Sequence, residues 1–165
     1  MTDSLGWRKK FAVLIPSTNT SVQPEFDDMR PVGVTNHISR IRIPNIPLAS
    51  DADFNKLIDL IGSAQDEAVI SAMSCEPDRL VLGISAETFW GGVEGNASFE
   101  ERIRARSGLQ VSTGASACRD ALRAYGVRRI AVFSPYQPIA DREVSRFFTE
   151  AGFEVAAVTG LRCAS

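Results

Sequence analysis

Two polar stretches of the sequence hold side chains that could bind a carboxylate. The first, IPSTNTS, ends an apolar run and contains Ser17, Thr18 and Asn19. Hydroxyl and amide groups between a strand and a helix can donate hydrogen bonds to an anion without any positive side chain. The alternative is an ordinary helix cap, which needs only Thr20 or Ser21. Because five polar residues in a row exceed that need, the stretch predicts a cradle for an anionic group.

The second stretch, GISAETFWGG, begins at Gly83 after another apolar run. Gly83 leaves space above the end of a strand, and Ser85 can donate from its hydroxyl or its backbone N–H. Phe89 and Trp90 could wall an apolar pocket, or they could pack on a neighbouring helix. In open α/β sheets, ligands bind beyond the carboxyl ends of the strands, so this loop is a candidate binding site.

Other side chains could also take part in chemistry. Tyr136, in FSPYQP, could reach a cleft between two halves of the chain, and packing on a sheet edge is an equal alternative. Glu87 is expected to face solvent or cap a helix, because a carboxylate buried beside an anion site would repel the ligand or have a raised pKa. Cys163 is the most accessible thiol but has no helper residue nearby, and Cys75 and Cys118 are expected in the core.

The composition excludes several classes of function. A net charge of −2 and a pI near 5.5 give no electrostatic reason to bind nucleic acid or an anionic membrane. No apolar stretch approaches the ~20 residues that span a bilayer. The single histidine leaves almost no material for a His-based metal site or a Ser-His-Asp triad, and the sequence has no phosphate-binding glycine loop. Three widely spaced cysteines indicate a reducing, cytoplasmic location without a disulfide framework or a zinc site.

Strands alternate with helices along the chain. Continuous or alternating apolar runs predict strands, and apolar residues at i, i+3 and i+4 predict helices. Together they predict an α/β fold with a mainly parallel sheet and right-handed crossovers. The expected strands are 10–15, 38–43, 79–84, 129–134 and 153–158, and the expected helices are 54–73, 115–125 and 138–151, with another starting near Val22.

An internal repeat divides the chain. KKFAVLIP at 9–16 matches RRIAVFSP at 128–135, an offset of 119 residues, and the same offset relates the end of the next strand in each half. Basic residues before an apolar strand are common in α/β proteins, so the matching spacing carries more weight than the octapeptide. The repeat predicts a first α/β lobe at 1–112 and a second at 113–165. Because the second half is shorter, we expect a partial chain with one complete lobe and the opening βαβ unit of another.

Four segments carry a family resemblance: IPSTNT, GIS, GLRCAS and, most specifically, STGASACRDALRAYGVRRIAVFSPY at 112–136. They resemble the aspartate/glutamate racemase superfamily, and most closely its branch of maleate isomerase and arylmalonate decarboxylase. The resemblance covers nearly all 165 residues. It implies two pseudo-symmetric α/β lobes, with mainly parallel sheets flanked by helices and the active site between them. The second lobe would be incomplete in this chain, because family chains are longer.

The resemblance also implies which residues do the chemistry. Racemases and isomerases of the superfamily carry a cysteine at the position of Gly83. The decarboxylase branch has a glycine there and keeps only a second-lobe cysteine, which would lie beyond Ser165 and is not Cys163. Ser85 matches a residue of the decarboxylase dioxyanion hole, and Tyr136 matches its tyrosine. The resemblance therefore favours a decarboxylase, because racemisation needs two acid/base groups on opposite faces of one carbon.

The function predicted is cofactor-independent decarboxylation of a malonate-type dicarboxylate through an enediolate, by a chain that is inactive on its own. Ile84 stands where the decarboxylases have a hydroxyl residue, and Asn19 is more like the isomerases. The alternatives are a maleate cis–trans isomerase, an Asp/Glu racemase-like enzyme, and a lobe that binds a carboxylate without turnover. No metal, cofactor, nucleic acid or membrane partner is expected. The predicted site comprises Ser85 and Tyr136 as catalytic residues, and Ser17, Thr18, Asn19, Gly83, Ile84, Phe89 and Trp90 as substrate-binding residues.

Overall fold

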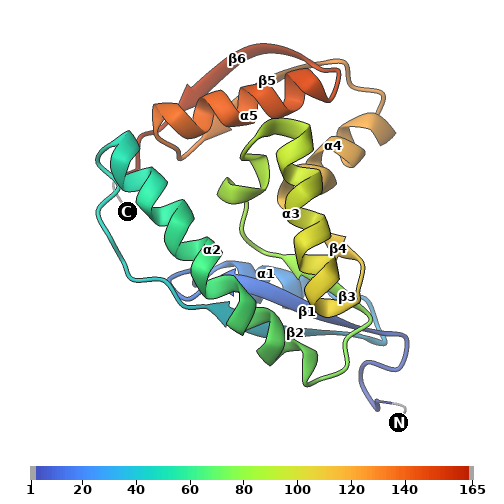
Figure 1. The fold of residues 1–165 in the computed structure, drawn as a ribbon. Helices are drawn as coiled ribbons and strands as arrows, with labels where there is room; N and C mark the ends of the chain where they lie inside the picture. Colours follow the sequence, from blue (N-terminus) through green and yellow to red (C-terminus); the bar gives the residue numbers. More distant parts are fainter. Residues whose placement is uncertain (1–2, 164–165) are drawn as a thin grey trace.

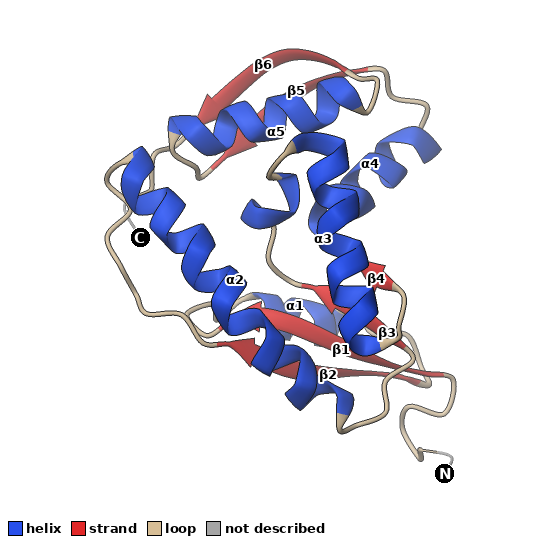
Figure 2. Cartoon of the chain, in the orientation of Figure 1, coloured by secondary structure: helices blue, strands red, loops and turns tan. Residues whose placement is uncertain are grey.

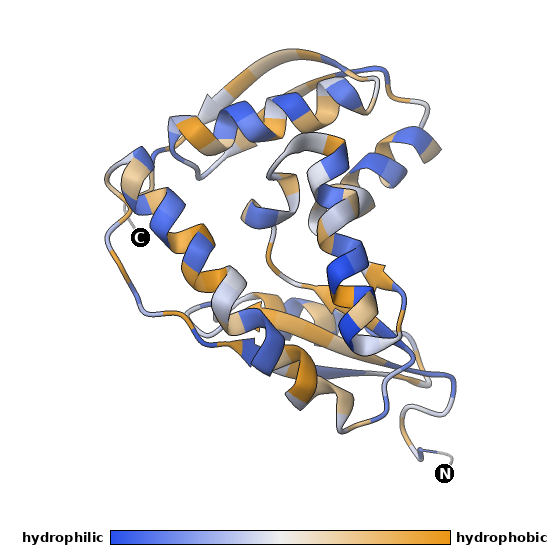
Figure 3. Ribbon diagram, in the orientation of Figure 1, coloured by the Kyte–Doolittle hydropathy of each residue, from blue (hydrophilic) through white to orange (hydrophobic). Residues whose placement is uncertain are grey.

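The first lobe is built on a parallel sheet with β1 near its centre. In the computed structural model, which describes residues 3–163, its four strands lie in the order β2-β1-β3-β4 (Figures 1 and 2). Residues Ala12 to Ile15 of β1 are completely buried, which explains the uninterrupted apolar run in the sequence and the hydrophobic colouring of this strand in Figure 3. The strands are β1 (Lys9–Pro16), β2 (Val34–Ile41), β3 (Arg79–Leu82) and β4 (Val111–Ser112).

A long helix covers one face of this sheet. Helix α2 begins after Ser50, whose side chain accepts a hydrogen bond of 3.2 Å from the N–H of Asp53. Its buried residues include Ile61 and Val69, which pack against β1 and β2, and Ser39 of β2 donates a 2.7 Å hydrogen bond to its backbone. The helical elements of the lobe are α1 (Val22–Asp28), α2 (Asp51–Met73), the 3₁₀ helix η1 (Ala86–Phe89) and α3 (Gly92–Ser107).

The second lobe repeats the opening of the first. Strands β5 and β6 pair in parallel, and helix α5 packs one of its faces against them. The 119-residue offset carries the pair of Lys10 and Thr35 in the first sheet onto the pair of Arg129 and Glu154 in the second. The repeated sequence therefore corresponds to a repeated strand register. The elements are α4 (Gly114–Ala124), β5 (Arg129–Ser134), α5 (Pro138–Glu150) and β6 (Glu154–Gly160).

Aromatic packing joins the two lobes. Phe89 of η1 lies in the core of the second lobe, with its ring centroid 5.4 Å from that of Phe147 and at 80° to it. The backbone N–H of Val93 at the start of α3 donates a 2.8 Å hydrogen bond to the carboxylate of Glu150 on α5. The link between the lobes runs through Thr113, whose side chain caps α4. The predicted boundary between the two lobes, between residues 112 and 113, falls in this link and stays a prediction.

The predicted α/β fold of two lobes with parallel sheets is confirmed, but some elements differ. Strand β2 runs from 34 to 41 rather than from 38 to 43, because Gly33 at a φ of 82° makes the turn that starts the strand earlier. Helix α3 was not predicted. It is polar and contains two glycines, and its buried residues are only Gly92, Asn96 and Ile103.

The expectation that Cys118 lies in the core is wrong. Helix α4 buries residues of its first turn, Ala115 and Ser116, whereas Cys118 is exposed. Cys75 follows the end of α2 and is half-buried, and its thiol donates to the carbonyl of Ala72 at 3.2 Å. Within residues 3–163, no helix combines the length and the apolarity needed to cross a membrane.

Candidate functional site

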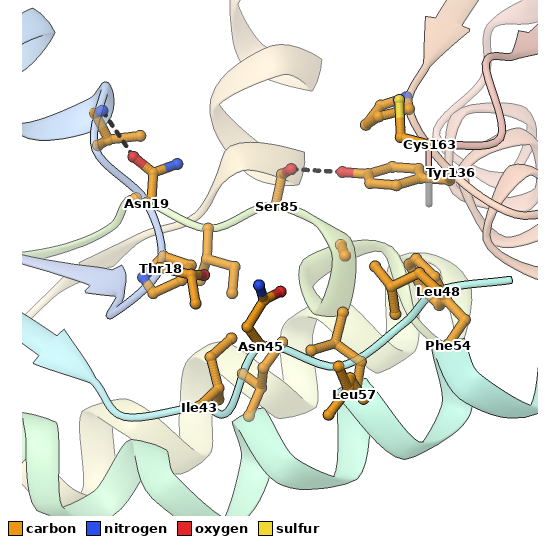
Figure 4. Close-up of a pocket in the computed structure, with 18 of the residues that line it drawn as sticks. Thr18, Asn19, Ile43, Asn45, Leu48, Phe54, Leu57, Ser85, Tyr136 and Cys163 are labelled. Atoms are coloured by element: carbon orange, nitrogen blue, oxygen red, sulfur yellow. Dashed lines mark hydrogen bonds between the residues drawn. The ribbon is translucent and has the colours of Figure 1, made fainter. Parts of the chain in front are cut away.

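A cavity of about 460 Å³ lies where the strand ends of the two lobes meet (Figure 4). Residues that follow β1, β2 and β3 line it from the first lobe, and residues that follow β5 and β6 line it from the second. This is the location expected for a ligand site in a parallel α/β fold. Six of the predicted site residues line the cavity: Thr18, Asn19, Gly83, Ile84, Ser85 and Tyr136.

Ser85 and Tyr136 meet across the cavity. The Ser85 Oγ and Tyr136 Oη atoms are 2.5 Å apart and share one hydrogen bond, in which either hydroxyl can donate. Ser85 is exposed and follows β3, whereas Tyr136 is half-buried and follows β5. Burial raises the pKa of Tyr136 above its ordinary value, although the bond to Ser85 opposes this rise. The phenol is therefore protonated at neutral pH and can donate a hydrogen bond.

Asn19 both shapes its loop and faces the cavity. Its Oδ1 atom accepts hydrogen bonds from the backbone N–H groups of Ser21 (3.0 Å) and Val22 (2.9 Å). The cap of α1 is therefore the side chain of Asn19, not that of Thr20 or Ser21. Since these two N–H groups are occupied within the loop, they do not form the expected cradle. Figure 4 shows the amide nitrogen of Asn19 on the side of Ser85, where it can donate to a ligand.

Ser17 does not line the cavity, but it holds the segment that does. Its Oγ atom donates to the carbonyl of Ile43 and accepts from the N–H of Ile43, both at 3.1 Å. This fixes the loop 43–48 beside the end of β1. In Figure 4, Asn45 from this loop points between Thr18 and Ser85. Asn45 is a polar lining residue that the sequence analysis missed.

An apolar wall faces the polar side chains. It comes from the loop after β2 and from the first turns of α2, and Figure 4 shows it opposite Asn19 and Ser85. Phe54 is 2% exposed and packs edge-on against Tyr136, with ring centroids 5.7 Å apart. One signal in the sequence could have predicted part of this wall, namely the apolar residues of IPNIPL in a proline-rich loop. The wall consists of Ile43, Ile46, Leu48, Phe54, Leu57 and Ile61.

Phe89 and Trp90 do not line this cavity. Phe89 lies in the second-lobe core, which agrees with the alternative prediction that this aromatic residue packs on a neighbouring helix. Trp90 stacks on the far side of Phe54, with ring centroids 6.0 Å apart and planes at 17°. The apolar wall of the cavity is therefore Phe54 and its neighbours, with Trp90 behind it.

Gly83 sits at a closed strand end. A Cβ atom at this position would lie 2.6 Å from Cγ2 of Ile15 and 2.9 Å from Cγ1 of Val22. Both side chains branch at Cβ and cannot simply swing away. The glycine is therefore required by close packing, and a larger residue, including cysteine, would have to displace its neighbours.

The expectation that Glu87 faces solvent or caps a helix is wrong. Glu87 is 6% exposed, and its Oε1 atom accepts a 2.8 Å hydrogen bond from the side chain of Gln65 on α2. Burial raises its pKa to about 7, against the lowering effects of Gln65 and Arg102. The residue lies outside the lining of the cavity between the lobes, so it does not repel an anion held there.

A buried polar network positions Ser85. The hydroxyl of Thr88, which is fully buried, donates to the carbonyl of Ser85 at 2.7 Å and accepts from the N–H of Ala115 at 3.2 Å. Asn96 of α3 donates to the carbonyl of Thr88 (3.0 Å) and to the hydroxyl of Thr113 (3.0 Å). These bonds fix η1 to α3 and to the start of α4. The carbonyl of Ser85 is therefore held by Thr88, which is itself bonded to Asn96 of α3 and to Ala115 of α4.

The cavity is lined without formal charge. None of its described lining residues is Asp, Glu, Lys, Arg or His. Cys163 lines the end nearest the second lobe, and its N–H donates to the carbonyl of Pro135 at 3.0 Å. Across residues 3–163, no cluster of His, Cys, Asp and Glu has the arrangement of a metal site. The lining can therefore hold a carboxylate only through neutral hydroxyl and amide donors.

Comparisons with known proteins agree with this fold. The chain resembles the structure of Nocardia farcinica maleate cis-trans isomerase bound to TRIS, with a TM-score of 0.81, 18% identity and coverage of 94% of this chain and 64% of that chain. A variant of the maleate isomerase Iso from Pseudomonas putida S16 with maleate has a TM-score of 0.80 and 20% identity. The match covers 94% of this chain and 64% of that chain. The structure of arylmalonate decarboxylase has a TM-score of 0.69 and 17% identity, and the match covers 92% of this chain and 62% of that chain.

The chain thus spans less than two thirds of the length of these structures. A search of curated proteins finds no match. The resemblance to the aspartate/glutamate racemase superfamily is confirmed at the level of the family. The sequence profile of arylmalonate decarboxylase matches residues 48–165, which is most of the chain. The chain therefore belongs to the arylmalonate decarboxylase family.

Proposed function

We propose that this chain forms the substrate-binding part of a cofactor-independent decarboxylase that acts on a malonate-type dicarboxylate. The observation that carries the proposal is the cavity itself, which sets neutral hydrogen-bond donors against an apolar wall. Ser85, Tyr136 and Asn19 offer the donors, and Phe54 and Leu57 belong to the wall. A diacid with two carboxylates on one carbon would place one group on each side.

The two sides of the cavity would treat the carboxylates differently. The carboxylate beside Ser85 and Tyr136 gains hydrogen bonds, whereas the carboxylate against the apolar wall loses water without replacement. Poor solvation favours its departure as neutral carbon dioxide. The bond between the α-carbon and the departing carboxylate breaks, and its electron pair forms the enediolate with the carboxylate that remains. Donors aimed at the enediolate oxygens stabilise the charge that develops there.

The hydroxyl pair has one proton to give. Ser85 and Tyr136 carry two hydroxyl protons, and one of them is used in the bond between the two oxygens. The other is free for the ligand, and a donor that itself accepts a hydrogen bond is polarised and strengthened. The amides of Asn19 and Asn45 can add further donors. The enediolate must finally take a proton on its α-carbon, which the family resemblance assigns to a second-lobe cysteine beyond Ser165.

Closed packing at Gly83 supports decarboxylation over isomerisation. One related structure is a variant of the Nocardia farcinica maleate isomerase with a covalently bound succinylcysteine intermediate. At Gly83 no thiol is present, and Ile15 and Val22 leave no room for one. Protonation from one side after loss of carbon dioxide needs a single acid, so a decarboxylase does not require a thiol at the strand end of the first lobe.

Maleate isomerisation remains the second candidate function. The observation that favours it is the position of Asn19, because this isomerase-like residue turns its amide toward the cavity. In this alternative, Cys163 would be the thiol available among the described residues for addition to the double bond.

Product analysis separates these functions. We would incubate phenylmalonate, maleate and L-aspartate separately in heavy water and follow each by proton NMR. With a complete second lobe, we expect phenylmalonate to give phenylacetate with one deuterium at the α-carbon. The 165-residue chain should show no turnover above background. Conversion of maleate to fumarate would contradict the proposal. Turnover by the 165-residue chain that Cys163→Ala abolishes would make Cys163 the acid and overturn its assignment to a residue beyond Ser165.

A further inference from the structure

A second cavity, of about 320 Å³, lies in a groove between α2 and α3. None of its lining residues lines the cavity between the lobes. We call it the helix groove. The residues that line it are Ile58, Gly62, Glu87, Trp90, Gly95, Ser98, Phe99 and Arg102.

Glu87 in the helix groove has one carboxyl oxygen without a partner. Its Oε1 atom accepts from Gln65, but its Oε2 atom is buried and makes no hydrogen bond within the described part of the chain. A buried polar atom without a partner destabilises the folded chain, because it has lost its hydrogen bond to water without replacement. Glu87 lines the groove, but Oε2 itself is buried, so a molecule in the groove supplies the missing hydrogen bond only when the carboxyl group turns toward the groove.

One amide group holds Glu87 and Arg102 side by side. Gln65 is fully buried; its Nε2 atom donates to Glu87 at 2.8 Å, and its Oε1 atom accepts from Nη2 of Arg102 at 3.1 Å. The carboxyl and guanidinium groups therefore flank the amide, and no direct ion pair joins them among residues 3–163. A direct pair would have satisfied both groups. In this arrangement each keeps hydrogen-bonding capacity for a ligand.

Apolar surface surrounds the two charged groups. The guanidinium carbon of Arg102 lies 5.3 Å from the ring centroid of Phe99, so the cation is placed over an aromatic face. Trp90 and Ile58 line the same groove. A molecule that bound there would contact both a pair of opposite charges and an apolar wall.

We propose that the helix groove binds a small zwitterion, an α-amino acid with an apolar side chain. Its ammonium group donates to Oε2 of Glu87, and its carboxylate accepts from Arg102. The side chain lies against Trp90, Phe99 and Ile58. A simple anion would meet the carboxyl group of Glu87, and a simple cation would meet Arg102, so each would gain one contact and suffer one repulsion. A molecule that carries both charges satisfies the two groups at once.

Three probes of similar shape test this requirement. They are L-leucine, 4-methylpentanoate, which lacks the amine, and 3-methylbutylamine, which lacks the carboxylate. Trp7→Phe leaves Trp90 as the only tryptophan, so its fluorescence reports the groove in the 165-residue chain. At pH 8, we expect L-leucine to change this fluorescence with saturation. Each single-charge probe should bind at least tenfold more weakly.

Variants assign the two charges. Glu87→Gln keeps the shape of the side chain, and Arg102→Met keeps an unbranched stem over Phe99. Each should weaken L-leucine binding at least tenfold, whereas Arg106→Met, on the same helix but outside the groove, should leave it unchanged. No saturable signal with L-leucine would overturn the proposal, as would equal binding of L-leucine and 4-methylpentanoate. The probe comparison uses no substitution in the groove, so it stands even if a groove variant fails to fold.

Discussion

Ser85 and Tyr136 link the two lobes through a hydrogen bond of 2.5 Å between their hydroxyl oxygens. The two residues lie 51 positions apart and follow different sheets. Each is a polar residue that follows a strand and lines the cavity. The pair therefore couples the geometry of the carboxylate-binding side to the way in which the lobes pack. Phe54 supports this contact, because its ring packs edge-on against Tyr136.

Ser85→Ala should raise the pKa of Tyr136. Burial already raises this pKa, and the hydrogen bond from Ser85 counteracts it by stabilising the phenolate. Removal of that bond leaves burial unopposed. The titration can be followed by phenolate absorbance in a Tyr125→Phe background, since the chain has only two tyrosines. Ser71→Ala, at an exposed serine on α2, is the control. An unchanged or lowered pKa of Tyr136 would show that the two hydroxyls do not interact in solution.

Gly83→Ala should destabilise the chain by about 1–3 kcal/mol, because the new methyl group overlaps Ile15 and Val22. Gly62→Ala is a matched control in the interior of α2, where a Cβ atom meets nothing within 4 Å. It should stabilise the chain by up to about 1 kcal/mol through helix propensity. Urea unfolding followed by circular dichroism measures both. If Gly83→Ala is neutral, the strand end is open and the packing argument against a thiol at this position fails.

The sequence predicted those parts of the site that depend on strand ends. Thr18, Asn19 and Tyr136 each follow a predicted strand, and Gly83 lies near the end of the predicted strand 79–84, which in the structure ends at Leu82. Parallel strands bring their carboxyl ends to one edge of the sheet. Their roles in binding and catalysis remain predictions. Strands β1 and β5 could be predicted because their apolar runs are short and bounded by basic residues and proline.

The remaining features depend on contacts between distant residues. Half of the apolar wall comes from α2, whose Phe54 looks like any other core position of an amphipathic helix. Phe89 could not be assigned to the second-lobe core because its partners, such as Phe147, lie in the other half of the sequence. The burial of Glu87 depends on Gln65, 22 residues earlier, and no local pattern signals that pair.

Glu87 should make the stability of the chain depend on pH. Its pKa is about 7 in the folded chain, against an ordinary value of 4.5. Between these values the folded chain keeps a proton that the unfolded chain releases. The contribution to stability is therefore full below pH 4.5 and is lost as the pH rises to about 7. The loss is on the order of 3–4 kcal/mol at most, since one pKa unit corresponds to about 1.4 kcal/mol.

Comparison with Glu87→Gln isolates this effect, because glutamine cannot titrate. As the pH rises from 4.5 to 8, the free energy of unfolding of the unmodified chain should fall relative to that of Glu87→Gln. Urea unfolding at several pH values measures it. A difference that stays constant over this range would mean that the carboxyl group of Glu87 is solvated in the folded chain.

Thr88→Val should destabilise the chain by about 1–3 kcal/mol, although it preserves shape. The valine leaves the N–H of Ala115 without the hydroxyl that accepts from it and removes one donor to the carbonyl of Ser85. Thr88→Ser keeps the hydroxyl and should restore most of this loss. Thermal and urea unfolding test the pair of variants. If serine is no better than valine, the methyl group of Thr88 matters and its hydrogen bonds do not.

Calorimetric titration of the 165-residue chain with phenylmalonate tests the central claim, that Ser85 and Tyr136 hold one carboxylate of a malonate-type diacid. We expect saturable binding to the unmodified chain. Ser85→Ala should weaken it about tenfold or more, because the loss of one hydrogen bond to a charged group is worth about 1.5–3 kcal/mol. Tyr136→Phe should also weaken phenylmalonate binding, and Ser71→Ala should leave the affinity unchanged. Absence of binding, or an affinity that neither Ser85→Ala nor Tyr136→Phe changes, would contradict the account.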